Sequence, residues 1–267
     1  MFVSVGTVPA PASPQSLPAG TPAALELLKQ RSIWQLQGPI NGYSRCTGPA
    51  LATQAWAGRR FTILAPPPGS ALPRARLRVR LLEDGYPCWF EPSDLLGRAV
   101  VVAPPAARCT PSLNQAAITA RLPAVLAFGL AALAQPNTYL WGGSLGPDFD
   151  CSGLLQRAYA SAGIWIPRDA YLQERFCQPV AVRPGVIHRL QPGDLIFFGS
   201  PQRCTHVGLH MGGGRYLHSS GQAHGRNGLG IDNLAPHNSD PVARHYRHEL
   251  RGAGRITHCH DGSALPA

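Results

Sequence analysis

The chain has 267 residues, of which 44% are hydrophobic and 14% are charged. This composition supports a packed core and excludes global disorder, and the length fits one large domain or two ordinary ones. The formal net charge of +10 comes almost entirely from arginine, since Lys29 is the one lysine. The basic residues are scattered and form no run of five, so the sequence predicts no nucleic-acid partner and indicates a compositional bias instead.

Neither a signal peptide nor a membrane anchor is predicted. The first residues lack a basic region followed by an apolar core, and the longest apolar stretch, Leu122–Ala134, is too short to span a bilayer. The seven cysteines are odd in number and form no CxxC pair, which indicates neither a zinc site nor a disulfide scaffold. We therefore expect a cytoplasmic protein with no membrane partner.

The first part of the chain has the pattern of a small β-barrel. Residues 1–30 are predicted as a flexible N-terminal segment, and residues 31–104 contain short runs broken by turn residues. Three of these runs predict strands, and the second alternates strictly between arginine and apolar residues. They are Arg59–Leu64, Arg76–Leu81 and Tyr86–Phe90.

The second part, residues 111–256, mixes helices and strands, so the predicted fold class is α+β. The run Leu122–Ala134 predicts a helix that is apolar on nearly all sides and should therefore be buried. A second helix is expected over Cys151–Ala162, with Asp150 as its N-cap. Three strands follow, and Gly212–Gly214 connects the last two as a hairpin. They are Asp194–Phe198, His206–Met211 and Arg215–Ser219.

Cys151 opens the second predicted helix. A thiol at this position meets the positive end of the helix dipole and free backbone N–H groups, which favour the thiolate. The alternative interpretation is a small buried side chain, the usual role of a free cysteine. A cysteine nucleophile also needs a base.

The predicted hairpin offers that base. With a three-residue loop at Gly212–Gly214, Gly208 faces His218, so His206 and His218 lie on one face as diagonal neighbours. A two-residue loop would put the two histidines on opposite faces of the sheet. His210 shares the face of His206, so the pattern leaves it open as the base.

Five motifs now stand in order along the second part of the chain. They are Tyr139–Gly143 (YLWGG), Asp150–Leu154 (DCSGL), Leu190–Phe198 (LQPGDLIFF), His206–Leu209 (HVGL) and Tyr216–Ser220 (YLHSS). Together they resemble the NlpC/P60 cysteine peptidases, which implies a papain-like domain with helices packed on an antiparallel sheet. The resemblance implies Cys151 as nucleophile, His206 as general base and His218 as the residue that orients it. It also implies that Tyr139 helps to hold the oxyanion.

Within that family the chain is most similar to the γ-D-glutamyl-L-diamino acid dipeptidyl peptidases, whose N-terminal bacterial SH3-like domain narrows the cleft. The segments Glu83–Trp89 (EDGYPCW) and Pro167–Gln173 (PRDAYLQ) carry this closer similarity. The resemblance implies a substrate-recognition set around the free amine of the peptide, and we expect Arg168 to attract its carboxylates. The set is Tyr86, Asp150, Ser152, Asp169 and Arg168.

The implied function is hydrolysis of the γ-D-Glu–diaminopimelate bond in murein peptides that carry a free N-terminal L-Ala. The product would be L-Ala-γ-D-Glu, and the implied role is recycling of cell-wall peptides. No cofactor and no metal are expected. Two alternatives stay open: a non-catalytic protein that binds peptidoglycan peptides, and a zinc hydrolase built on Cys151, His206 and His218, although the chain lacks an HExxH pattern.

Overall fold

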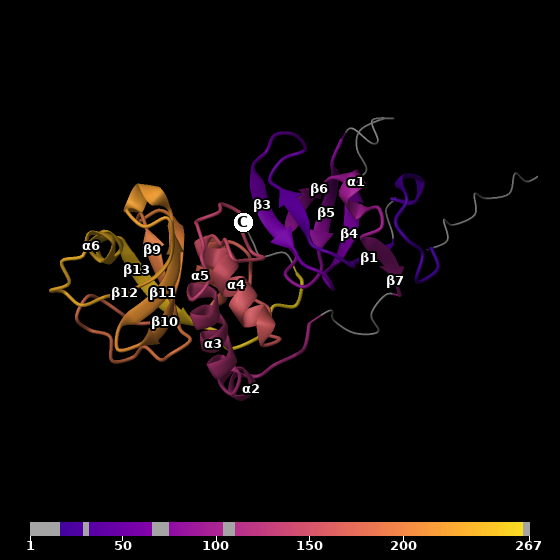
Figure 1. Cartoon of the computed structure of the whole chain (residues 1–267). Helices are drawn as coiled ribbons and strands as arrows, with labels where there is room; N and C mark the ends of the chain where they lie inside the picture. Colours follow the sequence, from indigo (N-terminus) through magenta and orange to yellow (C-terminus); the bar gives the residue numbers. More distant parts are fainter. Residues whose placement is uncertain (1–16, 29–31, 66–74, 104–109, 264–267) are drawn as a thin grey trace, which may run out of the picture.

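The computed structural model describes residues 17–28, 32–65, 75–103 and 110–263. Two antiparallel sheets lie at opposite ends of the molecule, with a group of helices between them (Figure 1). The architecture is α+β, with the all-β part first in the chain, as the sequence predicts. Residues 104–109, which connect the two predicted domains, and the first 16 residues of the predicted flexible segment lie outside the described residues.

Seven strands build the N-terminal sheet, in the order β3-β2-β6-β5-β4-β1-β7. In β5 the apolar residues Leu77, Val79 and Leu81 are buried while Arg78 and Arg80 are exposed, because alternate side chains of a strand point to opposite faces. One short helix, α1 (Pro92–Leu95), precedes the last strand. The strands are β1 (Ile33–Leu36), β2 (Ile40–Tyr43), β3 (Leu51–Ala55), β4 (Arg60–Ala65), β5 (Leu77–Leu81), β6 (Pro87–Phe90) and β7 (Ala99–Val102).

Residues 17–28 correct part of the flexible-segment prediction. They pack along β7, where the backbone of Ala23 donates a hydrogen bond to Ala99 and Thr21 accepts one from Val101. A short 3-10 helix, η1 (Leu25–Leu27), follows, and Leu28 is buried in the core of the N-terminal sheet. The apolar side chains of this stretch explain the difference, because their burial offsets the entropy lost on ordering.

The C-terminal sheet has six strands in the order β12-β11-β10-β9-β13-β8. Helices α3, α4 and α5 pack on one side of it and α6 packs on the other, so β9 is buried along its whole length. The helices are α2 (Gln115–Thr119), α3 (Leu122–Leu133), α4 (Cys151–Ser161), α5 (Ala170–Phe176) and α6 (Pro241–His248), with the 3-10 turn η2 (Gln222–His224). The strands are β8 (Gln178–Val180), β9 (Leu195–Gly199), β10 (Cys204–Gly212), β11 (Arg215–Ser220), β12 (Gly228–Asn233) and β13 (Leu250–Arg255).

The predicted pairing around His206 and His218 is confirmed by β10 and β11, but the predicted three-residue loop is wrong. Gly212 pairs with Arg215, so only Gly213 and Gly214 form the loop, and an irregularity before Gly212 preserves the predicted register. Leu209 pairs with Leu217 and His210 with Tyr216, and the register then shifts by one residue before Gly212. Continuing this pairing brings Gly208 opposite His218, where a Cβ built on Gly208 would lie 3.5 Å from that of His218. His206 and His218 therefore share one face of the sheet.

The prediction that the first apolar helix is buried is wrong. In α3 only Val125 and Gly129 are buried, and Leu130 is 48% exposed. One narrow stripe of the helix packs on α4 and the sheet, with Gly129 directly against Leu217, and the other sides face solvent. By length and composition alone, the helical stretch 115–133 could cross a membrane. Of the residues in its most apolar part, 17% are buried in the structure.

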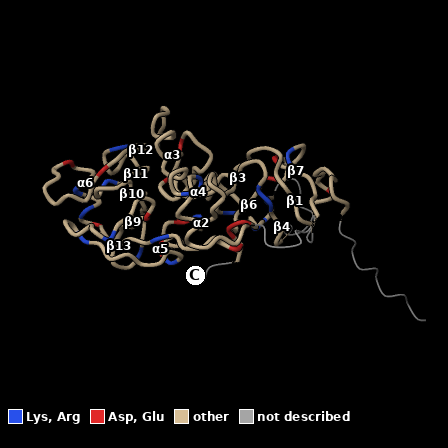
Figure 2. Tube along the Cα trace, turned by 90° about the horizontal axis from the view of Figure 1, so that it is seen from below, with Lys and Arg blue, Asp and Glu red and all other residues tan. Residues whose placement is uncertain are grey.

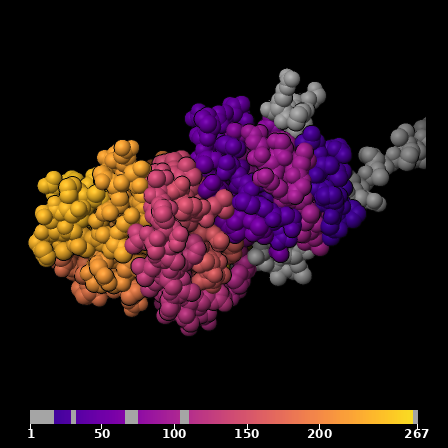
Figure 3. Space-filling model, viewed as in Figure 1, coloured from indigo at the N-terminus to yellow at the C-terminus, as the bar shows by residue number. Residues whose placement is uncertain are grey.

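Charged side chains join the two domains. Arg59 donates to Glu83 and Asp84 of its own domain, and Asp84 accepts a 2.6 Å bond from Gln156 of α4. The rings of Trp56 and Trp165 stack across the boundary at 5.4 Å. The space-filling view shows the N-terminal domain seated directly on the helical part of the second one (Figure 3).

The C-terminal segment 257–263 also lies at this boundary. The backbone N–H of His260 donates to Trp165, and Thr110 donates to the carbonyl of His260. A Cβ added to Gly85, in the β5–β6 turn, would lie 2.5 Å from the carbonyl oxygen of Ser263.

Lysine and arginine residues are spread over both domains (Figure 2).

Candidate active site

A cavity of about 780 Å³ lies between the two domains. Strand β3 and the β5–β6 turn form one wall, the start of α4 and α5 the floor, and β10, η2 and α6 the opposite wall. Eight of the nine predicted site residues line it, and the ninth, His218, lies directly behind His206. The eight are Tyr86, Tyr139, Asp150, Cys151, Ser152, Arg168, Asp169 and His206.

Cys151 is the first residue of α4, and Asp150 caps this helix by accepting a 2.6 Å bond from the backbone of Gly153. The helix start sits against the preceding loop, where a Cβ on Gly153 would lie 2.1 Å from the carbonyl oxygen of Gly143. Only glycine fits this contact. This close contact fixes the start of α4, so that Cys151 faces the cavity.

The environment of Cys151 favours the thiol, whereas the helix position alone favours the thiolate. Burial raises the pKa of Cys151 to about 12, and the neighbouring carboxylate of Asp150 acts in the same direction. That carboxylate already occupies the positive end of the helix. The backbone N–H of Val207 acts in the opposite direction on the same pKa, which places the sulfur beside β10, next to His206.

His206 and His218 form a hydrogen-bonded pair, with His206 Nε2 and His218 Nδ1 2.8 Å apart. Burial lowers the pKa of His206 well below its usual range, and His218 adds to that shift, so His206 is neutral at pH 7. Tyr246 of α6 stacks on the imidazole of His206 at 4.2 Å. His210 is engaged elsewhere, because its Nδ1 bonds to Gln191 and its Nε2 accepts from Gly214.

Asp150 and Arg168 are occupied with each other. Arg168 is 1% exposed and donates to both carboxylate oxygens, at 2.6 Å and 3.1 Å, as well as to Ser152 and Thr53. Asp150 also accepts from the backbone of Gly142. Arg168 thus acts as a buried counter-ion that holds Asp150 at the helix start. It also lines the cavity, and its attraction for substrate carboxylates stays a prediction.

Asp169 has a different environment. It accepts a 3.1 Å hydrogen bond from the hydroxyl of Tyr86, which reaches it from the N-terminal domain. Burial raises the pKa of Asp169, although the positive charge of Arg168 acts against this. A carboxylate at a cavity wall with a raised pKa gains from a bound cation, so this pair suits an ammonium group.

Tyr139 and Trp141 form the rim on the other side of the cysteine. Burial raises the pKa of Tyr139, and Cys151 and Asp150 add to the shift, so the hydroxyl stays protonated and able to donate. Trp141 is 71% exposed at the cavity mouth.

Sequence reasoning missed three residues of this site: Asp232, Arg226 and Tyr246. Asp232 accepts a 2.7 Å bond from His218, and Arg226 donates to Asp232 in turn. Their signal was weak, because β12 was not predicted and an irregular connection separates it from β11. The regular pairing of His218 with Gly230 now explains how Asp232 comes within reach.

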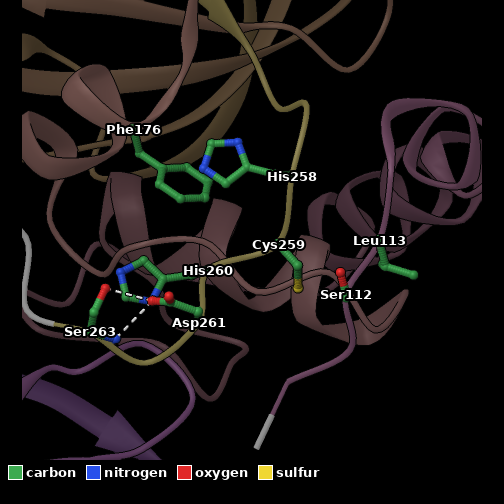
Figure 4. A pocket seen from close by; sticks show the side chains of 8 residues that line it. All are labelled: Ser112, Leu113, Phe176, His258, Cys259, His260, Asp261 and Ser263. Carbon is green, nitrogen blue, oxygen red and sulfur yellow. Dashed lines mark hydrogen bonds between the residues drawn. The ribbon is translucent and has the colours of Figure 1, made fainter. Parts of the chain in front are cut away.

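A second cavity of about 260 Å³ lies away from this site, between the C-terminal segment and the end of α5 (Figure 4). The rings of Phe176 and His258 contact there at a tilt of 47°, with centroids 4.3 Å apart, and Cys259 accepts a hydrogen bond from the backbone N–H of Trp165. Across residues 17–28, 32–65, 75–103 and 110–263, no group of three or more His, Cys, Asp or Glu side chains is placed to hold a metal ion.

Residues 136–251 match the NlpC/P60 family, and residues 45–95 match the bacterial dipeptidyl-peptidase SH3 domain. Bifunctional muramidase/DL-endopeptidase CwlT of Bacillus subtilis is 37% identical over 127 residues, which cover 46% of this chain and 33% of that protein. Gamma-D-glutamyl-L-lysine dipeptidyl-peptidase of Bacillus cereus is 44% identical over 84 residues, which cover 30% of this chain and 24% of that protein. Both alignments span a third or less of these relatives' own lengths.

A crystal structure of an NlpC/P60 family protein from Bacillus cereus superposes with a TM-score of 0.42 and 22% identity, over 85% of this chain and 64% of that one. The two domain matches confirm the NlpC/P60 domain and the SH3-like domain that the sequence motifs predict, and each match overlaps one of the two sheets. The chain therefore contains an NlpC/P60 domain, preceded by a bacterial dipeptidyl-peptidase SH3 domain.

Proposed function

We propose that this protein is a cysteine peptidase that cleaves the γ-D-Glu–diamino acid bond of cell-wall peptides with a free N-terminal L-Ala. The observation that carries the proposal is one cavity in which Cys151 lies beside a hydrogen-bonded His206–His218 pair, while Tyr86 and Asp169 close part of the wall. The product would be L-Ala-γ-D-Glu, and the role would be recycling of such peptides in the cytoplasm. The named activity of the Bacillus cereus relative supports this substrate class.

The N-terminal domain supports a requirement for a free amine. Tyr86 belongs to that domain and bonds to Asp169 of the other, so the two domains together shape one part of the cavity. In the proposed complex the α-ammonium of L-Ala binds Asp169, and an acyl group on that nitrogen removes the charge on which the contact depends. Placing this ammonium also sets the distance from the substrate N-terminus to the cysteine, so the bond two residues away is presented for attack.

The chemistry follows the usual acyl-enzyme route. Cys151 Sγ attacks the γ-carbonyl carbon of D-Glu as His206 takes the thiol proton, and the hydroxyl of Tyr139 and the backbone N–H of Cys151 stabilise the oxyanion. Collapse breaks the C–N bond, and His206 gives its proton to the departing amine of the diamino acid. A water molecule, deprotonated by His206, then attacks the thioester and releases L-Ala-γ-D-Glu and free Cys151.

Mass spectrometry of digests tests the proposal. The substrates are L-Ala-γ-D-Glu-meso-diaminopimelate, the same peptide with lysine in third position, and an N-acetylated form of each. We expect L-Ala-γ-D-Glu and a free diamino acid from the free-amine peptides only. Equal cleavage of acetylated and free peptides would refute the free-amine requirement, and the ratio between the two unmodified peptides gives the diamino acid preference.

A non-catalytic peptide-binding protein is the second candidate, and C151A separates the two. The peptidase predicts that C151A abolishes product while it still binds peptide, whereas C46A, at an exposed cysteine outside the cavity, keeps full turnover. Unchanged turnover in C151A would show that Cys151 is not the nucleophile. Inactivation by iodoacetamide distinguishes the thiol enzyme from a zinc hydrolase, which chelators would inactivate.

A further inference from the structure

We propose that Asp232 is a positioning residue that fixes the tautomers of both His218 and His206, and so keeps one nitrogen of His206 free to take the Cys151 proton. The proposal rests on the peptidase function proposed above. Three side chains carry it, in a line that leads away from the cavity: His206 Nε2 lies 2.8 Å from His218 Nδ1, and His218 Nε2 lies 2.7 Å from Asp232 Oδ2.

Asp232 is held as a carboxylate. Arg226 Nη2 donates to its two oxygens, at 2.8 Å and 2.9 Å. Burial acts to raise the pKa of Asp232, but the bonds and charges of His218 and Arg226 outweigh it and hold this pKa below the usual range. An ionised carboxylate has lone pairs and no proton, so it only accepts hydrogen bonds.

The proton positions of both rings follow from this. Since Asp232 accepts, His218 carries its proton on Nε2, and Nδ1 of neutral His218 is then an acceptor. His206 must therefore donate from Nε2 to His218, which leaves His206 Nδ1 as its one unprotonated nitrogen. Burial lowers the pKa of both rings, which keeps them neutral at pH 7. His206 Nδ1 is thus the atom that receives the thiol proton.

The pairing of β11 with β12 places His218 and Asp232 within hydrogen-bonding distance. His218 of β11 pairs with Gly230 of β12, and Asp232 follows two residues later on the same face of that strand. A Cβ added to Gly230 would lie 2.2 Å from Arg226 Nη1, so the glycine makes the room in which Arg226 crosses the strand to reach Asp232. His218 and Asp232 are 0% and 5% exposed at their side chains, which shields their bond from water.

Other titratable groups face this line from neighbouring elements. Tyr216 of β11 and Tyr246 of α6 lie close enough to feel the charge of Asp232, which raises the pKa of both hydroxyls after the larger effect of burial. On the cavity side, His224 and His245 lower the pKa of His206 after burial and His218. None of these groups is a carboxylate next to His218, so Asp232 is the anion that sets its proton.

The test reads the tautomers directly. In full-length protein labelled with ¹⁵N in the histidine rings, long-range ¹H–¹⁵N correlation spectra distinguish a protonated from an unprotonated ring nitrogen. In the wild type we expect Nε2–H forms at both His206 and His218, with assignments taken from H206A and H218A. In D232N the amide can donate as well as accept, and in D232A the acceptor is gone, so we expect the Nδ1–H form of His218 to become populated.

Kinetics give the second readout. We expect kcat/KM to fall roughly tenfold to hundredfold in D232N, the range typical of residues that orient a catalytic group, with the acid limb moved to lower pH because a nearby anion no longer supports imidazolium. D194N is the matched control, because Asp194 is a buried carboxylate that pairs with Arg255 and contacts no catalytic histidine. D194N should keep the wild-type tautomers and pH profile.

Unchanged tautomers in both Asp232 variants, together with a wild-type pH profile, would overturn the proposal. A wild-type protein that cleaves no peptide would refute the peptidase function instead, and the tautomers would remain readable. The two failures are therefore distinguishable.

Discussion

The hydroxyl of Tyr86 donates a 3.1 Å hydrogen bond to Asp169, and this bond joins the SH3 domain to the wall of the catalytic cavity. One domain therefore supplies the group that orients Asp169 of the other. Under the proposed function, substrate selection depends on the interface between the domains as well as on the NlpC/P60 domain itself.

Y86F tests this dependence. Without its hydroxyl, the phenyl ring no longer orients Asp169, so we expect KM for the free-amine tripeptide to rise roughly tenfold while kcat changes little, as for the loss of one hydrogen bond to a charged group. Steady-state kinetics with the free and N-acetylated peptides measure it. Y43F, whose ring lies under Arg76 outside the cavity, is the control. A fall in kcat with unchanged KM would contradict this role.

The ionisation of Cys151 predicts how its alkylation depends on pH. Because burial raises its pKa to about 12, while burial also lowers the pKa of His206, the resting pair is a thiol beside a neutral imidazole. The thiolate is the reactive form, so the rate of alkylation by iodoacetamide should keep rising as the pH increases from 6 to 10. A rate that is already constant at the acidic end of this range would mean a preformed thiolate–imidazolium pair.

D84A should destabilise both domains together. The substitution removes a partner of the buried Arg59 guanidinium and of Gln156 across the domain boundary. Breaking a buried ion pair costs about 3–5 kcal/mol, which urea unfolding measures. E91A is the control, because Glu91 pairs with Arg76 at a partly exposed site and its loss should cost about 1 kcal/mol or less. Similar losses in both variants would contradict the importance of the buried pair.

G153A should disrupt the start of α4. A Cβ there would lie 2.1 Å from the carbonyl oxygen of Gly143, so either the loop or the helix must move. We expect a loss of at least about 1–3 kcal/mol in the free energy of unfolding, as for an overpacked core, and a large loss of activity. G252A is the matched control, since a Cβ there meets no atom within 4 Å. Thermal melts and the digestion assay together separate misfolding from a local displacement of Cys151.

The sequence predicts well what depends on local pattern. The alternation of Arg78 and Arg80 with apolar residues, the cap at Asp150, and the shared face of His206 and His218 are all present, because each follows from strand or helix periodicity. The five motifs predict the NlpC/P60 domain because each is a short stretch that can be recognised in the sequence itself.

Contacts between distant parts of the chain could not be predicted from the sequence. The saturation of Arg168 by Asp150 and the bond from His218 to Asp232 arise only when separate elements pack together. The exposure of Leu130 is a further case, since composition alone does not say which side of an apolar helix finds a partner.

The C-terminal segment has a practical consequence for choosing where to cut the chain. The family match ends at residue 251, yet His260 bonds to Trp165 and Thr110, and the turn at Gly85 lies against the backbone of Ser263. A protein cut after residue 251 would keep the residues that line the cavity between the domains, but it would lose the segment 257–263 that contacts both domains. A shortened form of this protein for expression should therefore keep the C-terminal segment 257–263.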